Sequence, residues 1–251
     1  MELNVVSFNV WCFSPPGKNH IFFRGPRLMK VLRKTDADII GLQENTPKMM
    51  KHLVRSLGKK YEIYNVYRAK HNLESTPILW KKDRFECLDK GCFWLSDTPD
   101  VESQGWDETK CYRVCLWAKL KDRKTGKVFT FMNTHFGFGE QCQLSSVDLI
   151  HKYNLEKSPF PTVITGDFNM RPDFAAYKAM TELYTDVNMA TAKDMGNTFH
   201  GYHPEQNSDA LIDYCFVDDG FKPVNYRRIT DTFLGLYPTD HYGVQAIIEA
   251  E

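Results

Sequence analysis

The feature of this sequence that most constrains its fold is a series of short apolar runs, each bounded by turn-forming residues. Runs of this length that are rich in β-branched and aromatic residues predict β-strands. They occur at residues 3–8, 39–42, 61–66, 77–80, 114–120, 128–133, 162–165, 211–217 and 242–248. The sequence therefore predicts a fold in which strands outnumber helices.

Helical spacing of apolar residues is confined to the intervening segments 27–33, 47–57, 143–153 and 174–183. Pro26 and Pro47 suit the first turns of the first two helices. Regular alternation of strand and helix stops after Pro77, so a mixed sheet or two packed sheets, with helices on the outer faces, is expected. Residues 96–110 and 188–209 are rich in polar and turn-forming residues and are predicted to be surface loops.

Length and composition favour one domain over residues 1–251, because sandwiches of this size use a single core. No apolar stretch approaches the roughly 18 residues of a membrane span, so we expect a soluble protein without stable membrane association. Residues 3–10 alternate like a strand and leave no room for an export signal. Seven scattered cysteines without a CxxC pair indicate reduced thiols and a cytoplasmic location.

The charge balance limits the class of partner. Lysine plus arginine equals aspartate plus glutamate at 32 each, so the chain has no global positive field to hold a long nucleic-acid duplex. A compact site can still bind a small phosphorylated molecule or a short single strand, since local charge sets the potential in a cleft. Nothing in the sequence indicates an obligate protein partner.

The most informative segment is VITGDFN, residues 163–169, an apolar run followed by glycine, a carboxylate and a carboxamide. Residues i and i+2 of an extended chain share a face, so Asp167 and Asn169 can address one object together. Taken alone, so short a match is better explained by an ordinary turn after a strand.

Further polar residues stand at the ends of other predicted strands. Asn9, Glu44 and His135 each follow an apolar run, and Asp240 and His241 directly precede the last one. Polar side chains placed repeatedly at strand ends are typical of a site presented by a rigid scaffold. The pattern therefore predicts that these side chains converge.

Two charged residues lie inside apolar strands, where an unpaired charge is costly. Asp213 needs a partner there, and a histidine is a suitable one. Arg113 is predicted to bind substrate by clamping a phosphate through two parallel hydrogen bonds. An internal ion pair of Arg113 with Glu44 or Asp240 is the alternative.

Taken in order, the segments FNVW, QEN, NTHF, GDFN, IDYCFV and TDH resemble the endonuclease/exonuclease/phosphatase superfamily, the DNase I-like proteins. The segments WLSDTPD and TFHGY resemble uncharacterised bacterial members similar to the nocturnin and deadenylase branch. The resemblance covers nearly the whole chain. It implies an α/β fold with four α-β-β-α layers, in which two mixed, mostly antiparallel sheets pack face to face with helices outside. It also implies dependence on Mg²⁺, with Mn²⁺ as the alternative ion.

The resemblance further implies a role for each matching residue. Glu44 would be the principal metal carboxylate, with Asn9 and Asp240 near the ion or its waters. Asp167 would orient or deprotonate the attacking water, and Asn169 would hold that water or a phosphate oxygen.

Two more pairs follow from the same resemblance. Asp213 would fix the tautomer of His241, which would donate to the phosphoryl oxygen as charge builds up. Glu74, in the segment LESTPILWKKDRF, would orient His135 so that this imidazole stabilises or protonates the leaving oxygen. A solvated surface position is the alternative for Glu74.

The expected activity is Mg²⁺-dependent hydrolysis of a phosphodiester or phosphomonoester by in-line attack of water, on a nucleotide-containing or small phosphorylated substrate. His200 and loop aromatic residues are expected to contact that substrate, or else to anchor their loops. The alternatives are a sphingomyelinase-like or inositol-phosphatase-like hydrolase, and a non-catalytic binding module on the same fold.

Overall fold

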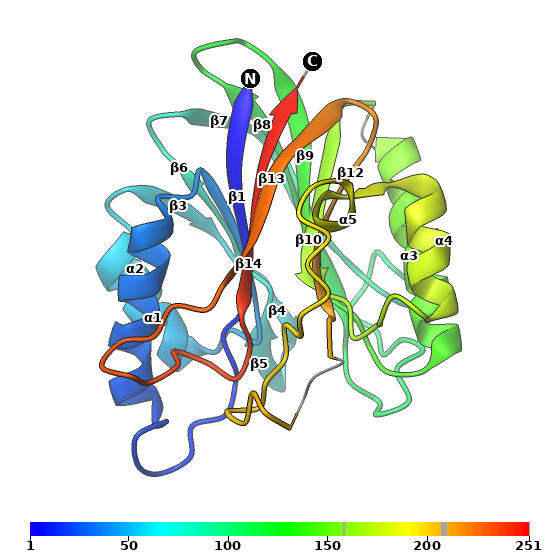
Figure 1. The fold of residues 1–251 in the computed structure, drawn as a ribbon. Helices are drawn as coiled ribbons and strands as arrows, with labels where there is room; N and C mark the ends of the chain where they lie inside the picture. Colours follow the sequence, from blue (N-terminus) through cyan, green and yellow to red (C-terminus); the bar gives the residue numbers. More distant parts are fainter. Residues whose placement is uncertain (158, 207–209, 251) are drawn as a thin grey trace.

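Two six-stranded sheets lie face to face between two pairs of helices in the computed structural model, which describes residues 1–157, 159–206 and 210–250 (Figure 1). The strands of the first sheet, in spatial order, are β13 (Phe221–Ile229), β14 (Gly243–Ala250), β1 (Glu2–Asn9), β2 (Ile39–Gln43), β6 (Ile78–Lys81) and β3 (Tyr61–Tyr64). Those of the second sheet are β11 (Thr185–Asp186), β12 (Asp213–Val217), β10 (Thr162–Asp167), β9 (Val128–His135), β8 (Val114–Asp122) and β7 (Phe85–Trp94).

Each large sheet contains one parallel pair among antiparallel neighbours. In the first sheet β1 runs parallel to β2, and in the second β10 runs parallel to β9. Every other pairing within the two sheets is antiparallel. A separate hairpin of β4 (Tyr67–Ala69) and β5 (Asn72–Ser75) completes the described strands. The prediction of two mixed, mostly antiparallel sheets is confirmed.

The core has three apolar layers. Residues such as Ile39 and Phe131 fill the space between the sheets. Helices α1 (Ile21–Thr35) and α2 (Pro47–Leu57) pack their buried faces, including Leu28 and Leu53, on the outside of the first sheet. Helices α3 (Glu140–Lys157) and α4 (Ala175–Leu183) cover the second sheet in the same way, through residues such as Val147 (Figure 1). The predicted four-layer sandwich is therefore confirmed, and a short helix, α5 (Val187–Ala190), follows α4.

Helix starts agree with the sequence prediction at α2 and differ at α1. Thr46 caps α2 and Pro47 occupies its first turn. Helix α1 begins at residue 21, so Pro26 lies inside the helix, and the prediction of a first-turn Pro26 was wrong. The first turn was hidden because Phe22 and Phe23, 66% and 57% exposed, break the polar face expected of a surface helix.

Every predicted strand overlaps an observed one. The short strands β4, β5 and β11 were not predicted, and neither were the longer strands β7 and β13. Both lie at or next to the edge of their sheet and carry many polar residues, so their apolar runs are too short to recognise. The expected surface loops are also partly wrong. Asp107 in the first loop and Thr198 in the second are fully buried, and residues 207–209 of the second lie outside the described residues.

None of the helices described here is long and apolar enough to cross a membrane.

Candidate active site

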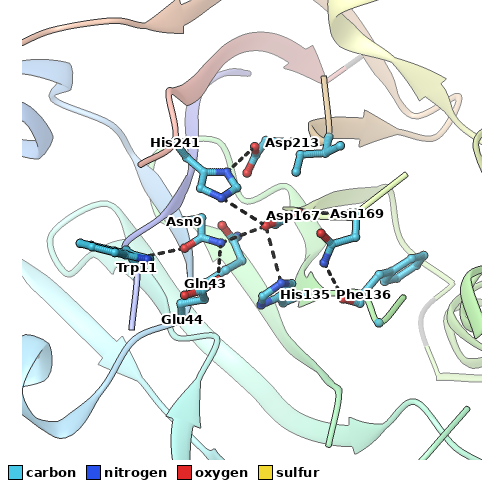
Figure 2. Close-up of polar contacts among 12 residues, drawn as sticks. Asn9, Trp11, Gln43, Glu44, His135, Phe136, Asp167, Asn169, Asp213 and His241 are labelled. Carbon is cyan, nitrogen blue, oxygen red and sulfur yellow. Dashed lines mark hydrogen bonds and ion pairs between the residues drawn. The ribbon is translucent and has the colours of Figure 1, made fainter. Parts of the chain in front are cut away.

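The candidate site lies where the carboxyl ends of the two parallel strand pairs face one another. Asn9 ends β1, and Glu44 directly follows β2 in the first sheet. His135 ends β9 and is paired with Asp167, the last residue of β10, in the second sheet. Side chains beyond the carboxyl ends of parallel strands commonly form ligand sites. The packing of the two sheets brings both sets together (Figure 2).

Asn9 joins the carboxylates of the two sheets. Its Nδ2 donates to Glu44 Oε1 at 3.0 Å and to Asp167 Oδ2 at 2.9 Å. Its Oδ1 accepts from the backbone N–H of Trp11 at 2.9 Å, which holds the amide in this orientation. The second Glu44 oxygen accepts from the backbone N–H of Cys12 at 2.8 Å. Burial favours the neutral form of Glu44, but these donors outweigh it and leave the pKa of Glu44 lowered.

His241 and Asp213 form a buried hydrogen-bonded pair. The His241 Nδ1 lies 2.9 Å from Asp213 Oδ2, and both side chains are at most 5% exposed. Burial by itself lowers the pKa of His241, but the charge and hydrogen bond of Asp213, with further help from Asp167 and Asp240, raise it to about 10. His241 is therefore held as an imidazolium, with Nε2 turned toward Asp167 at 3.8 Å.

Asp167 lies between the two imidazoles of the site. Its Oδ2 is 3.6 Å from His135 Nε2, in addition to its contact with His241 (Figure 2). Burial, followed by the negative charge of Asp213, raises the pKa of Asp167. The Oδ1 atom accepts from the backbone N–H of Asn169 at 3.0 Å, and the Asn169 amide donates to the carbonyl of Phe136 at 2.9 Å. The predicted partnership of Asp167 and Asn169 is thus a direct contact.

Three residues of the site have backbone conformations that L-residues rarely adopt. Trp11, Glu44 and Asn169 have φ values of 56°, 56° and 48°. They lie just after β1, β2 and β10, respectively. Non-glycine residues in this region are typical of sites where the surrounding structure fixes the backbone.

Glu74 lies on β5 beside His135 but is engaged elsewhere. Its Oε1 pairs with the guanidinium of Arg68 on β4, and His135 Nδ1 is 3.9 Å away, beyond hydrogen-bond distance. Burial, with the positive charges of Arg113 and Arg68, lowers the pKa of His135 well below its usual range. His135 is therefore neutral, and Glu74 approaches it without a direct hydrogen bond.

Arg113 is buried and forms an ion pair, but not with the carboxylates named in the sequence alternative. Its Nε donates to Asp107 Oδ2 at 2.7 Å. Asp107 also accepts from the N–H and hydroxyl of Thr109, which fixes the carboxylate within the loop. The expected partners Glu44 and Asp240 are replaced by a loop residue six positions away, because residues 96–113 fold inward.

His200 does not line the pocket formed by Glu44, Asp167 and His241, so its predicted contact with substrate is not supported by its position. Its ring is fully buried and packs on Tyr237 and Tyr242, with centroids 4.5 and 4.4 Å apart. Its Nδ1 accepts from the backbone N–H of Tyr202 at 3.1 Å. The side chain therefore stabilises its loop, which was the alternative interpretation for the loop aromatics.

A pocket of about 660 Å³ opens over this cluster. Glu44, Glu74, Asp167 and Asp240 supply its acidic groups, and Arg113 is one of its basic groups. Its aromatic lining comes from Trp11, Phe13, Phe138, Phe174 and Phe199. A pocket of this volume, with charged groups at its base and aromatic walls, fits a small organic molecule.

The donors in the pocket fit a hard divalent cation. Asp167 and Asp240 present buried carboxylates, and Glu44 a half-buried one, to one space, and burial raises the pKa of Asp240 to about 6. Buried acids in close company are stabilised by a cation, and an oxygen-rich set favours Mg²⁺ or Mn²⁺. In the described chain, ligand atoms of Asp167, Asp213 and His241 also lie within 4.8 Å of one another. Two of these three are already hydrogen bonded to each other, so the Glu44 side fits an ion better.

Sequence inspection missed a polar connection between the sheets beneath the site. Gln43 Nε2 donates to Asn133 Oδ1 at 2.8 Å and to Ser7 Oγ at 3.1 Å, and Thr165 Oγ1 donates to the same Asn133 oxygen. All four residues are fully buried. Gly41 allows this close approach, since a Cβ there would lie 2.4 Å from Asn133 Oδ1. Buried polar networks of this kind fix one arrangement of their elements.

Comparison with known proteins gives a consistent assignment. A family model described as "Endonuclease/Exonuclease/phosphatase family" matches residues 6–241. A family protein from Bacteroides thetaiotaomicron is 27% identical with a TM-score of 0.92, covering 100% of this chain and 98% of that one. A mannosyl-6-phosphatase of the same organism is 28% identical with a TM-score of 0.89, covering 98% and 99%.

More distant matches are informative about fold and length. The catalytic domain of human nocturnin shares the fold, with 15% identity, a TM-score of 0.76 and coverage of 100% and 94%. An uncharacterized protein of Acanthamoeba polyphaga mimivirus is 27% identical over 210 residues, 67% of this chain. The chain spans 30% of the length of that viral relative.

Proposed function

The chain belongs to the endonuclease/exonuclease/phosphatase family, and from this premise we propose that it is a metal-dependent phosphoesterase. The observation that carries the proposal is the position of Asp167. This buried carboxylate is bridged through Asn9 to Glu44 and lies between a neutral and a protonated imidazole. Such an array provides a base, a cation site and a positive electrostatic partner around one reacting phosphorus.

Asp167 is the proposed base for the attacking water. The pKa of Asp167 is raised, which makes the carboxylate a stronger base toward water at neutral pH. Asn169 is held against Asp167 through its backbone N–H, so its side-chain oxygen is available to orient the same water. His135 is the proposed hydrogen-bond donor to the leaving oxygen, since a neutral imidazole keeps one N–H.

His241 is the proposed stabiliser of charge on the phosphoryl oxygens. The hydrogen bond from Nδ1 to Asp213 keeps the imidazolium oriented, and Nε2 is directed into the pocket beside Asp167. A fixed positive donor that needs no reorganisation lowers the energy of the transition state.

Glu44 is the proposed main ligand of the divalent ion, with Asp240 beside it. When bound, Mg²⁺ supplies positive charge that polarises the phosphate oxygens. Asn9 keeps Glu44 ionised and in place, because its Nδ2, rather than its oxygen, contacts the carboxylate. We therefore assign Asn9 to positioning in this arrangement.

The proposed substrate is a small phosphorylated or nucleotide-containing molecule. The pocket volume and aromatic walls suit a sugar or base attached to the phosphate. Similarity to a mannosyl-6-phosphatase supports the same size class. The balanced charge of the chain gives no support for a long duplex as substrate.

The test is a panel of phosphoesters assayed with Mg²⁺ and with Mn²⁺, using D167N and E44Q as site variants and D219N, an exposed position, as matched control. We expect D167N and E44Q to reduce kcat/KM by about 10²–10⁴-fold and D219N to be unchanged. Hydrolysis at the normal rate by either site variant would refute the assigned roles. An inactive wild type that also releases no heat on Mg²⁺ titration would favour a binding module.

A further inference from the structure

Arg113 has unused hydrogen-bonding capacity directed at the pocket. The residue is 5% exposed and lines the same cavity as Glu44 and Asp167. Its Nε is occupied by Asp107, whereas neither Nη atom has a hydrogen-bond partner among the residues that the structure describes. An internal ion pair with Asp107 therefore accounts for one of its three nitrogens. The rest of the planar fork is suited to an oxyanion.

A second buried guanidinium lies in the same wall. Arg68 is 3% exposed, lines the cavity, pairs with Glu74 and donates through Nη1 to the carbonyl of Tyr112 at 3.2 Å. Its Nε is buried and has no hydrogen-bond partner within the described ranges. Arg68 therefore adds a buried positive charge beside the pocket, which favours an anion there.

The two guanidiniums lie close enough to act on each other and on His135. The positive charge of Arg113 lowers the pKa of Arg68, although burial is the larger cause. Both charges also act on His135, which lines the same cavity. Two buried like charges repel, and an anion bound between them relieves that repulsion.

The chemistry of the phosphate distinguishes what this wall can recognise. A phosphodiester has two non-bridging oxygens and one negative charge, whereas a phosphomonoester has three terminal oxygens and two charges near neutral pH. The part of the pocket lined by His241 and the carboxylates proposed to bind the cation is suited to the oxygens that both esters share. Additional cationic donors gain most from the extra oxygen and charge of the monoester.

We propose that Arg113, supported by the positive charge of Arg68, binds the third terminal oxygen of a phosphomonoester and makes this site selective for phosphomonoesters over phosphodiesters. The inference rests on the proposed function and specifies its substrate class. It assigns the β4–β5 hairpin and the loop of residues 96–113 to specificity, since these segments carry the two arginines and their carboxylate partners.

Binding tests the proposal without turnover when every protein compared, including the one with both arginines intact (the wild type below), also carries D167N, which removes the proposed base. Methyl phosphate and dimethyl phosphate are titrated calorimetrically into the Mg²⁺-loaded wild type, R113M and the control R123M, whose arginine is 52% exposed. We expect the wild type and R123M to bind methyl phosphate at least about 10-fold more tightly than dimethyl phosphate. R113M should lose roughly 10- to 100-fold of its affinity for methyl phosphate and little for dimethyl phosphate. Equal affinities in the wild type, or equal losses for both ligands, would overturn the inference.

A second variant at the same position controls for misfolding, because R113M leaves the buried carboxylate of Asp107 without its partner. R113Q retains a donor for Asp107 but removes the charge and the fork, and it should show the same selective loss. Normal methyl phosphate binding by folded R113Q would contradict the role of the guanidinium.

Turnover separates this inference from the proposed function. Hydrolysis of p-nitrophenyl phosphate should fall about 10- to 100-fold in R113Q, while hydrolysis of methyl p-nitrophenyl phosphate changes less than about 3-fold. Arginine-dependent methyl phosphate binding in a protein that hydrolyses neither ester would refute the proposed catalysis and leave the anion site standing. Efficient hydrolysis of both esters with equal losses in R113Q would keep the proposed function and refute monoester selection.

Discussion

The contacts of Arg24 lead to a strong prediction. This fully buried side chain holds the backbone of residues 10–13, which follows β1 and contacts Glu44. Its Nη1 donates to the carbonyl of Val10, and its Nη2 donates to the carbonyls of Trp11 and Phe13 at 2.7 and 2.9 Å. The same segment includes Cys12, whose N–H donates to Glu44. No carboxylate pairs with Arg24 within residues 1–157, 159–206 and 210–250. Helix α1 thus supports the proposed metal carboxylate through the backbone.

The expected effect of R24M follows from these contacts. A hydrogen bond from a charged donor stabilises by about 1.5–3 kcal/mol. Water can reach the carbonyls of Trp11 and Phe13 more readily than that of Val10, and removing a buried charge recovers desolvation energy. We therefore expect a net loss of about 2–4 kcal/mol in the free energy of unfolding. Because Glu44 loses a well-placed donor, Mg²⁺ affinity should fall about 10- to 100-fold.

Urea unfolding followed by circular dichroism measures the first effect, and calorimetric Mg²⁺ titration measures the second. The control is R33M, in which an exposed arginine bonded to Ser56 is removed from the same helix. R33M should change the free energy of unfolding by less than about 0.5 kcal/mol. If R24M unfolds like R33M and binds Mg²⁺ like the wild type, the reasoning about Arg24 is wrong.

Three further predictions concern the pair beside Asp167, the specificity loop and the contact between the sheets. D213N should reduce kcat by about 10²–10⁴-fold in steady-state assays, because His241 loses its charged partner. The far-ultraviolet circular dichroism spectrum should be unchanged, and a normal kcat would contradict this role of Asp213. Burial raises the pKa of Asp107, but hydrogen bonds from Thr109 and Arg113 outweigh it and leave the pKa lowered. The stability from Asp107 is therefore present above its ordinary value of 3.8 and lost as pH falls through the lower folded-state pKa, so D107N should flatten the acid limb of urea-derived stability against pH. G41A should lower the free energy of unfolding in urea by about 1–3 kcal/mol, because its Cβ would lie 2.4 and 2.5 Å from polar atoms of Asn133 and Thr165. An unchanged free energy of unfolding would show that the sheets can separate at this point.

The sequence predicted most of the fold because the central strands carry a strong local signal. Strand β10, buried along its whole length, reads as a continuous apolar run, and its end at Asp167 is visible in the sequence. The edge region was less predictable. Strand β13 alternates buried and exposed residues irregularly and contains a bulge near Pro223, so its pairing with β14 is decided by the sheet and not by its own composition.

The sequence by itself determined which polar residues stand at the ends of the central strands, since a change from apolar to polar along the chain is a local property. Asn9, Glu44, His135 and Asp167 could be selected in this way. Only the tertiary structure decided which charges meet across space. It paired Arg113 with Asp107, packed the His200 ring against two tyrosines, and placed Arg68 in the pocket. The choice of partner depends on how the two sheets and the inward-folded loop pack together.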